Sequence, residues 1–361
     1  DGGALVLARS TETIAEADYL IMEATYGDRV HESSFDSLGK FFDIILKTTR
    51  RGGTVVIPSF AVGRTQELIY HLNIFYEEHR ELKAELDKIM VYVDSPLATS
   101  ATEIFRRNAQ VFDEETREYI LKGDNPLDFK NLIFTRSSEE SRQLNFNPAP
   151  KIIISASGMC EAGRIKHHLK HHLWDSKCSV VFVGYQAVGT LGRSLVNGDK
   201  DVSIFGEKIH VNAEIYNLEG FSGHADRDDL LEWLSSFITP PKKIFLVHGE
   251  EESKKGFART VKEVLGYDCT VVEDVSEYDL NSDQLLSIED TKNRVASQDQ
   301  LTDVKNQLSK IHEDLEAILY NANLAVGNGR TEEEINEINN LILELDKSSF
   351  KLGLAVTKKE A

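Results

Sequence analysis

Two histidines stand in similar local settings, each at a turn between an apolar run and an amphipathic helix. His224 lies in the segment 220–226 (GFSGHAD), and His248 follows the apolar run 244–247 (IFLV). In open α/β sheets the chemistry gathers just beyond the carboxyl ends of the strands. Because the two histidines are only 24 residues apart, we expect them to meet on one rim. The alternative is that each histidine merely caps a helix or has its hydrogen bonds satisfied in the core. This interpretation is weaker for such a pair than for a lone histidine.

A carboxylate, Glu23, stands in a third position of this kind. It follows the apolar run 19–22 (YLIM) and precedes a turn that contains Gly27. A carboxylate at the exit of a buried strand is a candidate catalytic group. A simple turn-forming acidic residue is the alternative interpretation.

Four strand–turn–helix units are predicted within residues 36–185 and just beyond. The expected pairs are strand 53–58 with helix 65–78, strand 89–93 with helix 98–107, strand 151–155 with a helix from about 163, and strand 179–185 with helix 190–196. Each strand is a short apolar run, and each helix has apolar residues at helical spacing. This alternation predicts a doubly wound parallel α/β domain.

Two of the turns place small residues and free backbone N–H groups at a helix N-terminus, which suits a phosphate. The candidate substrate-binding residues are Ser59, Arg64, Ser157, Gly158, Met159 and Arg164. Neither turn contains the Gly-Lys-Ser/Thr of a P-loop, so each motif is weak alone. Arginine would add a bidentate cation for a phosphate, and a packing arginine is the alternative.

The run 164–173 (RIKHHLKHHL) carries four histidines. Ile165, Leu169 and Leu173 form an apolar stripe, which predicts an amphipathic helix with its histidines and lysines in solvent. We expect this basic helix to help steer nucleic acid. A metal-binding helix is the alternative, but the glutamate of a metalloprotease motif is absent.

Length, net charge and cysteine content limit the classes of protein to which the chain can belong. The chain has 361 residues and a net charge of −19, which predicts two or three domains and argues against a general nucleic-acid binder. A local cationic groove or bound metal ions would still permit a nucleic-acid enzyme. Cys160, Cys178 and Cys269 lack CxxC spacing and are expected to be free thiols. With no apolar run near the ~20 residues of a membrane span and no signal peptide visible, we expect a cytoplasmic protein without a membrane partner.

Residues 276–361 differ from the rest. Apolar residues between 301 and 318 keep strict 3,4 spacing, and Thr331 with Glu334 forms a capping box that opens a second predicted helix. We expect a helical hairpin that packs on the body of the chain or, in a homodimer, on a second copy.

Seven segments, taken together and in order, resemble the β-CASP branch of the metallo-β-lactamase superfamily. These RNA-processing nucleases are similar to the endonuclease subunit of the cleavage and polyadenylation specificity factor. Within the family, this chain most resembles the bacterial and archaeal members. The segments are 22–27 (MEATYG), 58–64 (PSFAVGR), 94–98 (DSPLA), 157–164 (SGMCEAGR), 184–192 (GYQAVGTLG), 220–226 (GFSGHAD) and 246–250 (LVHGE). The likeness runs from about residue 4 to about residue 275.

The resemblance implies a fold. It is the C-terminal part of a metallo-β-lactamase αββα fold with an inserted doubly wound β-CASP domain, followed by a helical C-terminal tail. The implied parts are metallo-β-lactamase segments at 1–27 and 209–275, a β-CASP domain at 28–208 and the helical hairpin tail at 276–361.

It also implies site residues and a cofactor. Glu23 resembles the motif A acid, His224 the motif B histidine, and His248 the motif C histidine that ligates zinc. Two zinc ions would activate water for in-line attack on an RNA phosphodiester. His224, kept protonated by Glu23, would stabilise or protonate the leaving oxygen. The Ser/Gly turns would line the RNA groove.

One departure from the family is large. The first metal motif, His-x-His-x-Asp-His, is absent, and so is the separate histidine that follows it. We therefore expect an N-terminally truncated nuclease that is inactive alone, since a zinc site needs three or four protein ligands. Asp1, which precedes Glu23 by 22 residues, is a candidate for the metal-bridging aspartate or a remnant of the next loop.

Two other functions stay open from the sequence. The first is a metallohydrolase acting on DNA or a small phosphodiester, and the second is a non-catalytic pseudo-nuclease or assembly subunit. The sequence does not distinguish endonuclease from exonuclease action, and it does not give the RNA target or the oligomeric state.

Overall fold

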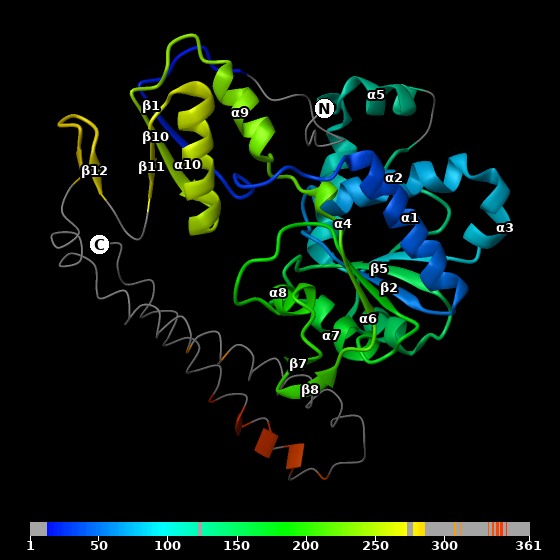
Figure 1. Cartoon of the computed structure of the whole chain (residues 1–361). Coiled ribbons are helices and arrows are strands. Elements are labelled where there is room, and N and C mark those ends of the chain that lie inside the picture. Colours follow the sequence, from blue (N-terminus) through cyan, green and yellow to red (C-terminus); the bar gives the residue numbers. More distant parts are fainter. Residues whose placement is uncertain are drawn as a thin grey trace. The chain divides into compact units, whose positions relative to one another are not determined.

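The computed structural model describes residues 13–121, 125–272 and 277–285, together with isolated positions between 307 and 344. The chain divides into one unit of residues 1–291 and a second of residues 292–361. Figure 1 labels the elements, and the fold given below is that of the first unit. Among the described helices, none has the length and apolar character needed to cross a membrane.

A six-stranded sheet lies at the centre of the predicted β-CASP region. Its order is β4-β3-β5-β2-β6-β9, and every neighbouring pair is parallel. The strands are β2 (Thr54–Pro58), β3 (Met90–Val93), β4 (Leu132–Phe134), β5 (Lys151–Ser155), β6 (Ser179–Phe182) and β9 (Glu214–Asn217). The four predicted strands are confirmed, but β6 ends at Phe182, where its partner β9 also ends.

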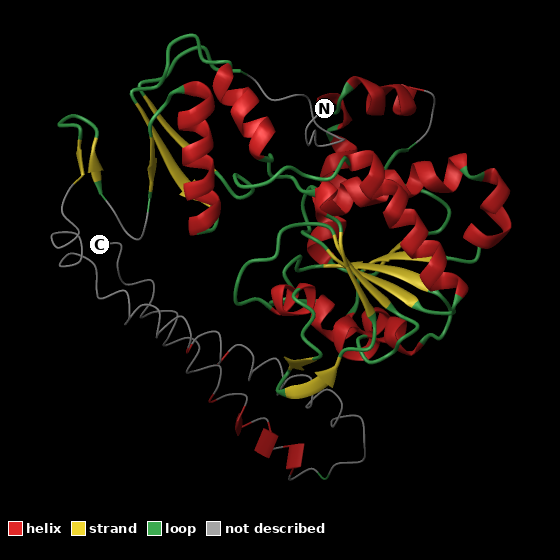
Figure 2. Cartoon of the chain, in the orientation of Figure 1, coloured by secondary structure: helices red, strands yellow, loops and turns green. Residues whose placement is uncertain are grey.

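Helices cover both faces of this sheet, as a doubly wound fold requires (Figure 2). They include α1 (Ser34–Arg50), α2 (Arg64–Glu78), α4 (Pro96–Arg107), α7 (Arg164–His172) and α8 (Leu191–Val196). Val55 and Ile57 pack in one hydrophobic cluster with Leu68 of α2, whereas Val56 packs in another with Leu169 of α7. Strands buried on both faces explain why the sequence reads as continuous apolar runs.

Further short elements complete this region. They are α3 (Lys83–Leu86), α5 (Glu114–Leu121), α6 (Ser138–Phe146) and the antiparallel pair β7 (Asp201–Ile204) and β8 (Glu207–His210).

A smaller parallel sheet has the order β1-β10-β11. Its strands are β1 (Tyr19–Glu23), β10 (Lys243–His248) and β11 (Cys269–Val271), and its helices are α9 (Arg227–Ser235) and α10 (Glu251–Leu265). Leu234, Leu246 and Phe257 are fully buried in its core. The strands and helices predicted around His224 and His248 are therefore confirmed.

The prediction of a solvated four-histidine helix is wrong. In α7, Lys166, His168 and His172 are buried along with the apolar stripe, because the helix lies on β2. His168 has no free ring nitrogen for a metal, since Nε2 lies 2.5 Å from an Asp94 carboxylate oxygen and Nδ1 lies 2.8 Å from Asn145 Oδ1. The alternative of a ligand helix is therefore excluded at this histidine.

The predicted tail is seen only in part. Its first described residues, which precede the predicted helices, form a two-stranded antiparallel sheet of β12 (Tyr278–Asp279) and β13 (Gln284–Leu285). The predicted capping box is confirmed, since Thr331 N donates to Glu334 Oε2 and Glu334 N donates to Thr331 Oγ1. Asp1 and most of the apolar seam lie outside the described residues. The three cysteines are free thiols, as predicted.

Candidate active site

Glu23 and His248 are brought together by the pairing of two neighbouring strands. β1 and β10 run parallel, and their register sets Glu23 opposite His248 after a shift at Met22. The chain turns directly after His248 at Gly249, whose φ is +122°. A Cβ on Gly249 would lie 2.7 Å from the carbonyl oxygen of Ala24. Glycine is therefore needed for this close exit from the strand.

His224 reaches the same place from the other sheet. It follows β9 and the 3₁₀ turn Glu219–Phe221. Asp226, just beyond it, caps α9 and accepts a hydrogen bond of 2.8 Å from His31 N, which fixes the loop. The rings of His224 and His248 stack with centroids 5.4 Å apart. The expected meeting of the histidines is confirmed, but they do not follow strands of one sheet, because β9 pairs with β6.

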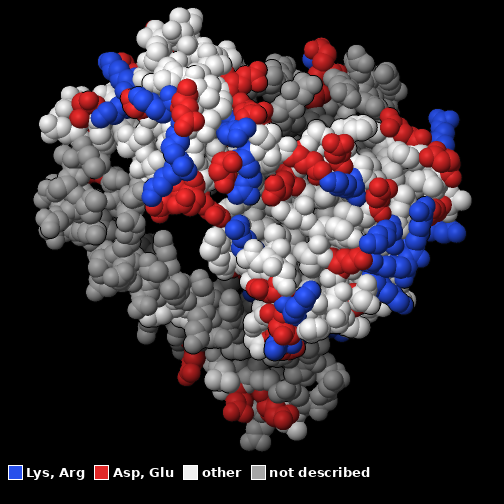
Figure 3. Space-filling model, in the orientation of Figure 1, with Lys and Arg blue, Asp and Glu red and all other residues white. Residues whose placement is uncertain are grey.

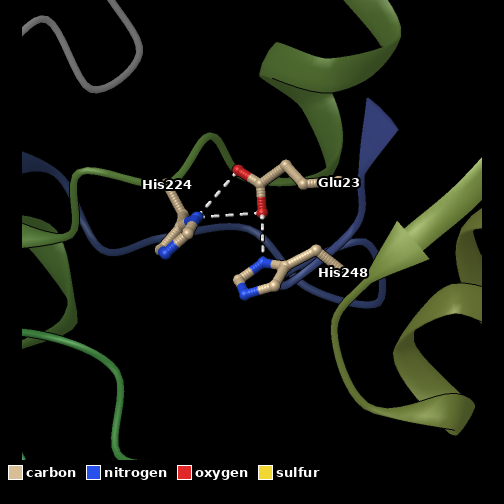
Figure 4. Close-up of side chains that lie close together, drawn as sticks. All are labelled: Glu23, His224 and His248. Carbon is tan, nitrogen blue, oxygen red and sulfur yellow. Dashed lines mark hydrogen bonds and ion pairs between the residues drawn. The ribbon is translucent and has the colours of Figure 1, made fainter. Parts of the chain in front are cut away.

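Glu23 and His224 form a hydrogen-bonded ion pair (Figure 4). His224 Nδ1 lies 2.9 Å from the Glu23 carboxylate. The hydrogen bond that His224 Nδ1–H donates to the Glu23 carboxylate raises the pKa of His224 above its ordinary value. Burial favours the neutral form of Glu23, but hydrogen bonds from His224 and Thr25 outweigh it and lower the pKa of this carboxyl. The pair therefore favours a protonated imidazole whose Nε2 points away from Glu23.

The buried hydroxyl of Thr25 connects this pair to His248. Thr25 Oγ1 donates a short hydrogen bond to Glu23 Oε2 and lies 2.9 Å from His248 Nδ1. An ionised carboxylate only accepts, so the hydroxyl hydrogen is used there and the hydroxyl accepts from His248 Nδ1–H. This assigns the tautomer of His248 and leaves the lone pair of Nε2 free. The His248 side chain is 62% exposed, so that nitrogen is open to a ligand.

Among the described residues, these three form a cluster that could hold a metal ion. One ligand atom from each of Glu23, His224 and His248 lies within 4.8 Å of the others. His248 fits a zinc ligand, because its exposed Nε2 is oriented by the contact that Nδ1 makes with Thr25. Glu23 and His224 are already bonded to each other. The set therefore fits one edge of a zinc site with an acid–base pair beside it.

The turn after β2 holds two further predicted residues. Ser59 is buried, and its hydroxyl oxygen lies 3.1 Å from Thr65 Oγ1. Arg64 forms a short ion pair with buried Glu67, and its own side chain is 10% exposed. A Cβ on Gly223 would lie 3.2 Å from Arg64 Nη2, so the guanidinium abuts the residue before His224. This cation thus stands beside the candidate site, although a carboxylate already partners it.

The turn after β5 is satisfied largely by itself. Ser157 Oγ accepts from the backbone N–H groups of Glu161 and Ala162, and the carbonyl oxygen of Met159 accepts from Gly192 N at 3.1 Å. The carbonyl oxygen of Gly158 accepts from Gln186 Nε2 at 3.0 Å.

Arg164, the last of the predicted residues, belongs to a buried network around Asp94. Its Nη1 lies 2.7 Å from Asp94 Oδ1, and His168 and Ser141 bind Oδ2 of the same carboxylate. Asp94 and His168 have no exposed side-chain surface. Both candidate phosphate arginines, Arg64 and Arg164, are therefore held by carboxylates, and their contact with a substrate stays a prediction.

Charged side chains of both signs are interspersed over the face of the molecule in Figure 3. A nucleic acid would therefore meet local charged groups on this face and not a single continuous basic surface, in keeping with the net charge of −19.

Two parallel α/β sheets thus place two histidines and a glutamate in one cluster that could hold a metal ion. Two family models match the chain. One is the Beta-Casp domain, at residues 65–195, and the other is the Zn-dependent metallo-hydrolase RNA specificity domain, at residues 208–272. The chain belongs to the β-CASP family, with a metallo-β-lactamase fold into which the β-CASP domain is inserted.

Curated relatives agree with this assignment. The chain is 40% identical over 236 residues to Ribonuclease TTHA0252 of Thermus thermophilus, covering 65% of this chain and 52% of that protein. It is 37% identical over 253 residues to Transcription termination factor FttA of Methanocaldococcus jannaschii, covering 67% of this chain and 38% of that protein. The chain thus spans about half the length of the first relative, and less of the second.

Proposed function

We propose that this chain provides the acid–base side of a zinc-dependent ribonuclease that hydrolyses RNA phosphodiester bonds. The observation that carries the proposal is the Glu23–His224 ion pair set directly beside the free Nε2 of His248. A protonated imidazole next to a metal ligand suits the departure of an oxygen from phosphorus. A match to an RNA specificity domain and a relative named as a ribonuclease support RNA as the substrate.

Each residue has a distinct part in this mechanism. His248 Nε2 would hold zinc, and Asp1 is proposed as a further ligand. Zinc, present as two ions in the complete site, would supply Lewis-acid activation of the attacking water. Glu23 orients His224 and stabilises its charged form, so that Nε2–H donates to the leaving oxygen. Arg64 would stabilise the charge that develops on the phosphate, and Glu67 holds its guanidinium in place.

Thr25 provides a test of the metal arrangement. Replacing Thr25 with valine keeps the shape but removes the acceptor for His248 Nδ1–H, so the histidine is free to change tautomer and orientation. Loss of a hydrogen-bond partner to a ligating histidine weakens metal affinity by roughly 10- to 100-fold. Competition with a chromophoric chelator should show this loss for Thr25→Val and near-normal affinity for Thr25→Ser. Equal affinities in both variants would show that the hydroxyl does not orient the ligand.

Substrate class is tested with RNA and DNA of one sequence. The protein with its complete zinc site, supplied with zinc, should cut a 5′-labelled single-stranded RNA and leave the matching DNA largely intact. A chelator should stop the cleavage, and added zinc should restore it. The lengths of the products separate internal cuts from removal of terminal nucleotides. Equal cleavage of DNA would favour a general phosphodiesterase, and no cleavage of either strand, with zinc bound, would favour a non-catalytic role.

A further inference from the structure

An exposed aromatic side chain lies in the loop that leads to the candidate site. Phe60 follows β2, precedes Arg64 by four residues, and is 49% exposed. Val62 in the same loop and Leu97 in the first turn of α4 are also exposed. The two segments adjoin, because Gln66 Nε2 reaches the carbonyl oxygens of Ala61 and Ala98. Three exposed apolar side chains thus lie on neighbouring segments at the carboxyl edge of the large sheet.

The Phe60 ring is held in place without being buried. A Cβ on Gly158 would lie 3.1 Å from two atoms of the ring, so the ring lies against the bare backbone of that glycine. Gly158 is itself fixed through its carbonyl oxygen by Gln186 Nε2. The Phe60 carbonyl oxygen accepts from Thr65 N and, at 2.7 Å, from Thr65 Oγ1. An ordered ring with half its surface in solvent gains little for stability from its exposed part.

The other end of the same loop reaches the catalytic histidine. The Arg64 guanidinium abuts Gly223, the residue before His224. A short, internally bonded loop therefore connects the Phe60 ring to the place where the scissile phosphate is proposed to lie. Proteins that bind single-stranded RNA place aromatic rings in this way, because an unpaired base stacks on an aromatic face whatever its identity.

We propose that the Phe60 ring is a stacking platform for one unpaired base of the RNA, close to the phosphodiester that is cleaved. This inference rests on the proposed ribonuclease function and extends it to single-stranded RNA as the form of substrate. Val62 and Leu97 widen the apolar surface around the stacked base. Gly158 contributes by its lack of a side chain, which gives a steric reason for a residue first considered as a phosphate ligand.

The test is RNA binding by the zinc-loaded protein in a His224→Ala background, which keeps the oligonucleotide intact. Fluorescence anisotropy is measured with a single-stranded oligoribonucleotide and with copies that carry one abasic spacer at each successive position. Phe60→Ala should weaken binding of the intact strand by roughly 5- to 150-fold, the usual loss for one stacked base. That loss should disappear for the copy whose spacer occupies the platform, because its base is already missing.

Two control variants separate stacking from folding and from general apolar contact. Phe60→Trp should retain the affinity, and its fluorescence should be quenched when RNA binds. Val264→Ala, which removes an exposed apolar side chain near the end of α10, should leave the affinity almost unchanged. Circular dichroism of each variant checks that the fold is kept.

Other outcomes overturn the platform. Equal RNA affinity of Phe60→Ala and the parent protein, or a loss that is the same for every spacer position, would contradict it while leaving the ribonuclease function standing. The second result would fit a protein-docking or structural role for the loop. Absence of RNA binding by the parent protein would remove both proposals.

Discussion

Replacement of His224 by alanine is expected to slow RNA cleavage by roughly 10²- to 10⁴-fold, the usual contribution of a positioned proton donor. The physical reason is the arrangement of its two nitrogens. Nδ1 is held by Glu23 at 2.9 Å, which leaves Nε2 as the proton donor to the leaving oxygen. RNA affinity should change little, because the imidazole acts on a charge that develops only in the transition state. Single-turnover cleavage and binding of the same RNA measure the two effects separately.

A matched histidine provides the control for this prediction. His210 on β8 also pairs with a carboxylate, Asp201, but it is exposed and belongs to the β7–β8 pair. His210→Ala should therefore cleave RNA at the normal rate. Glu23→Gln should fall between the two, since the amide keeps the shape of the carboxylate but no longer stabilises a charged imidazole. Undiminished cleavage by His224→Ala would show that its assigned role is wrong.

The second large effect is expected at Asp94, far along the chain from the histidines. Asp94→Asn would leave the buried His168 and the mostly buried Arg164 facing an amide in place of a carboxylate. Removing one member of a buried ion pair typically costs about 3–5 kcal/mol, because the remaining charge is uncompensated. Urea unfolding should show a decrease of this size in the free energy of unfolding of the part of the chain that contains the six-stranded sheet.

Asp201 offers the corresponding surface control. It pairs with His210 and Lys208, so it has the same kinds of partners as Asp94, but these groups are exposed to solvent. Asp201→Asn should leave the free energy of unfolding almost unchanged, since exposed ion pairs contribute little. Equal losses at Asp94 and Asp201 would mean that burial does not decide the strength of these pairs.

The Asp94 carboxylate should also make the free energy of unfolding depend on pH. Burial favours the neutral form of Asp94, but hydrogen bonds from His168, Ser141 and Thr135 outweigh it and hold the pKa of this carboxyl well below its ordinary value. The folded-state pKa thus lies below that of the unfolded chain, about 3.9. The stabilisation is complete above about pH 4 and is lost as the pH falls towards the folded-state pKa.

A comparison of unfolding free energies across this pH range checks the sign. The difference between the parent protein and Asp94→Asn should be constant above about pH 4–5 and should shrink below it. A difference that grows on acidification would contradict the depressed pKa.

The sequence indicated the proposed catalytic pair, Glu23 and His224, more readily than the groups that support it. Glu23, His224 and His248 each stand at a strand end or a glycine turn, and their flanking residues carry a family motif. Thr25 lies within the motif segment 22–27, but nothing in the sequence indicates that it contacts His248. Its role depends on the parallel register of β1 and β10, which brings residues 223 positions apart within hydrogen-bond distance.

His168 was predicted to be exposed but is buried. Its spacing in a run of histidines and lysines is typical of a solvated helix face. Its environment is set by Asp94, 74 residues earlier, and by the contact of α7 with β2. A buried polar residue looks like a surface residue in the sequence when its partner comes from a distant strand. The pairing of β9, which precedes His224, with the large sheet and not with β10 was likewise not evident from the sequence, because strand pairing joins residues that lie far apart in the chain.

The division of roles between the two histidines is tested most directly by zinc content after dialysis, determined by elemental analysis for the protein with its complete zinc site and for two single variants. Because His248 is proposed to hold zinc and His224 a proton, His248→Ala should lose bound zinc, whereas His224→Ala should retain the zinc of the parent protein and lose only cleavage. Equal loss of zinc from both variants would contradict this division, because both histidines would then be metal ligands and neither would be free to act as the acid.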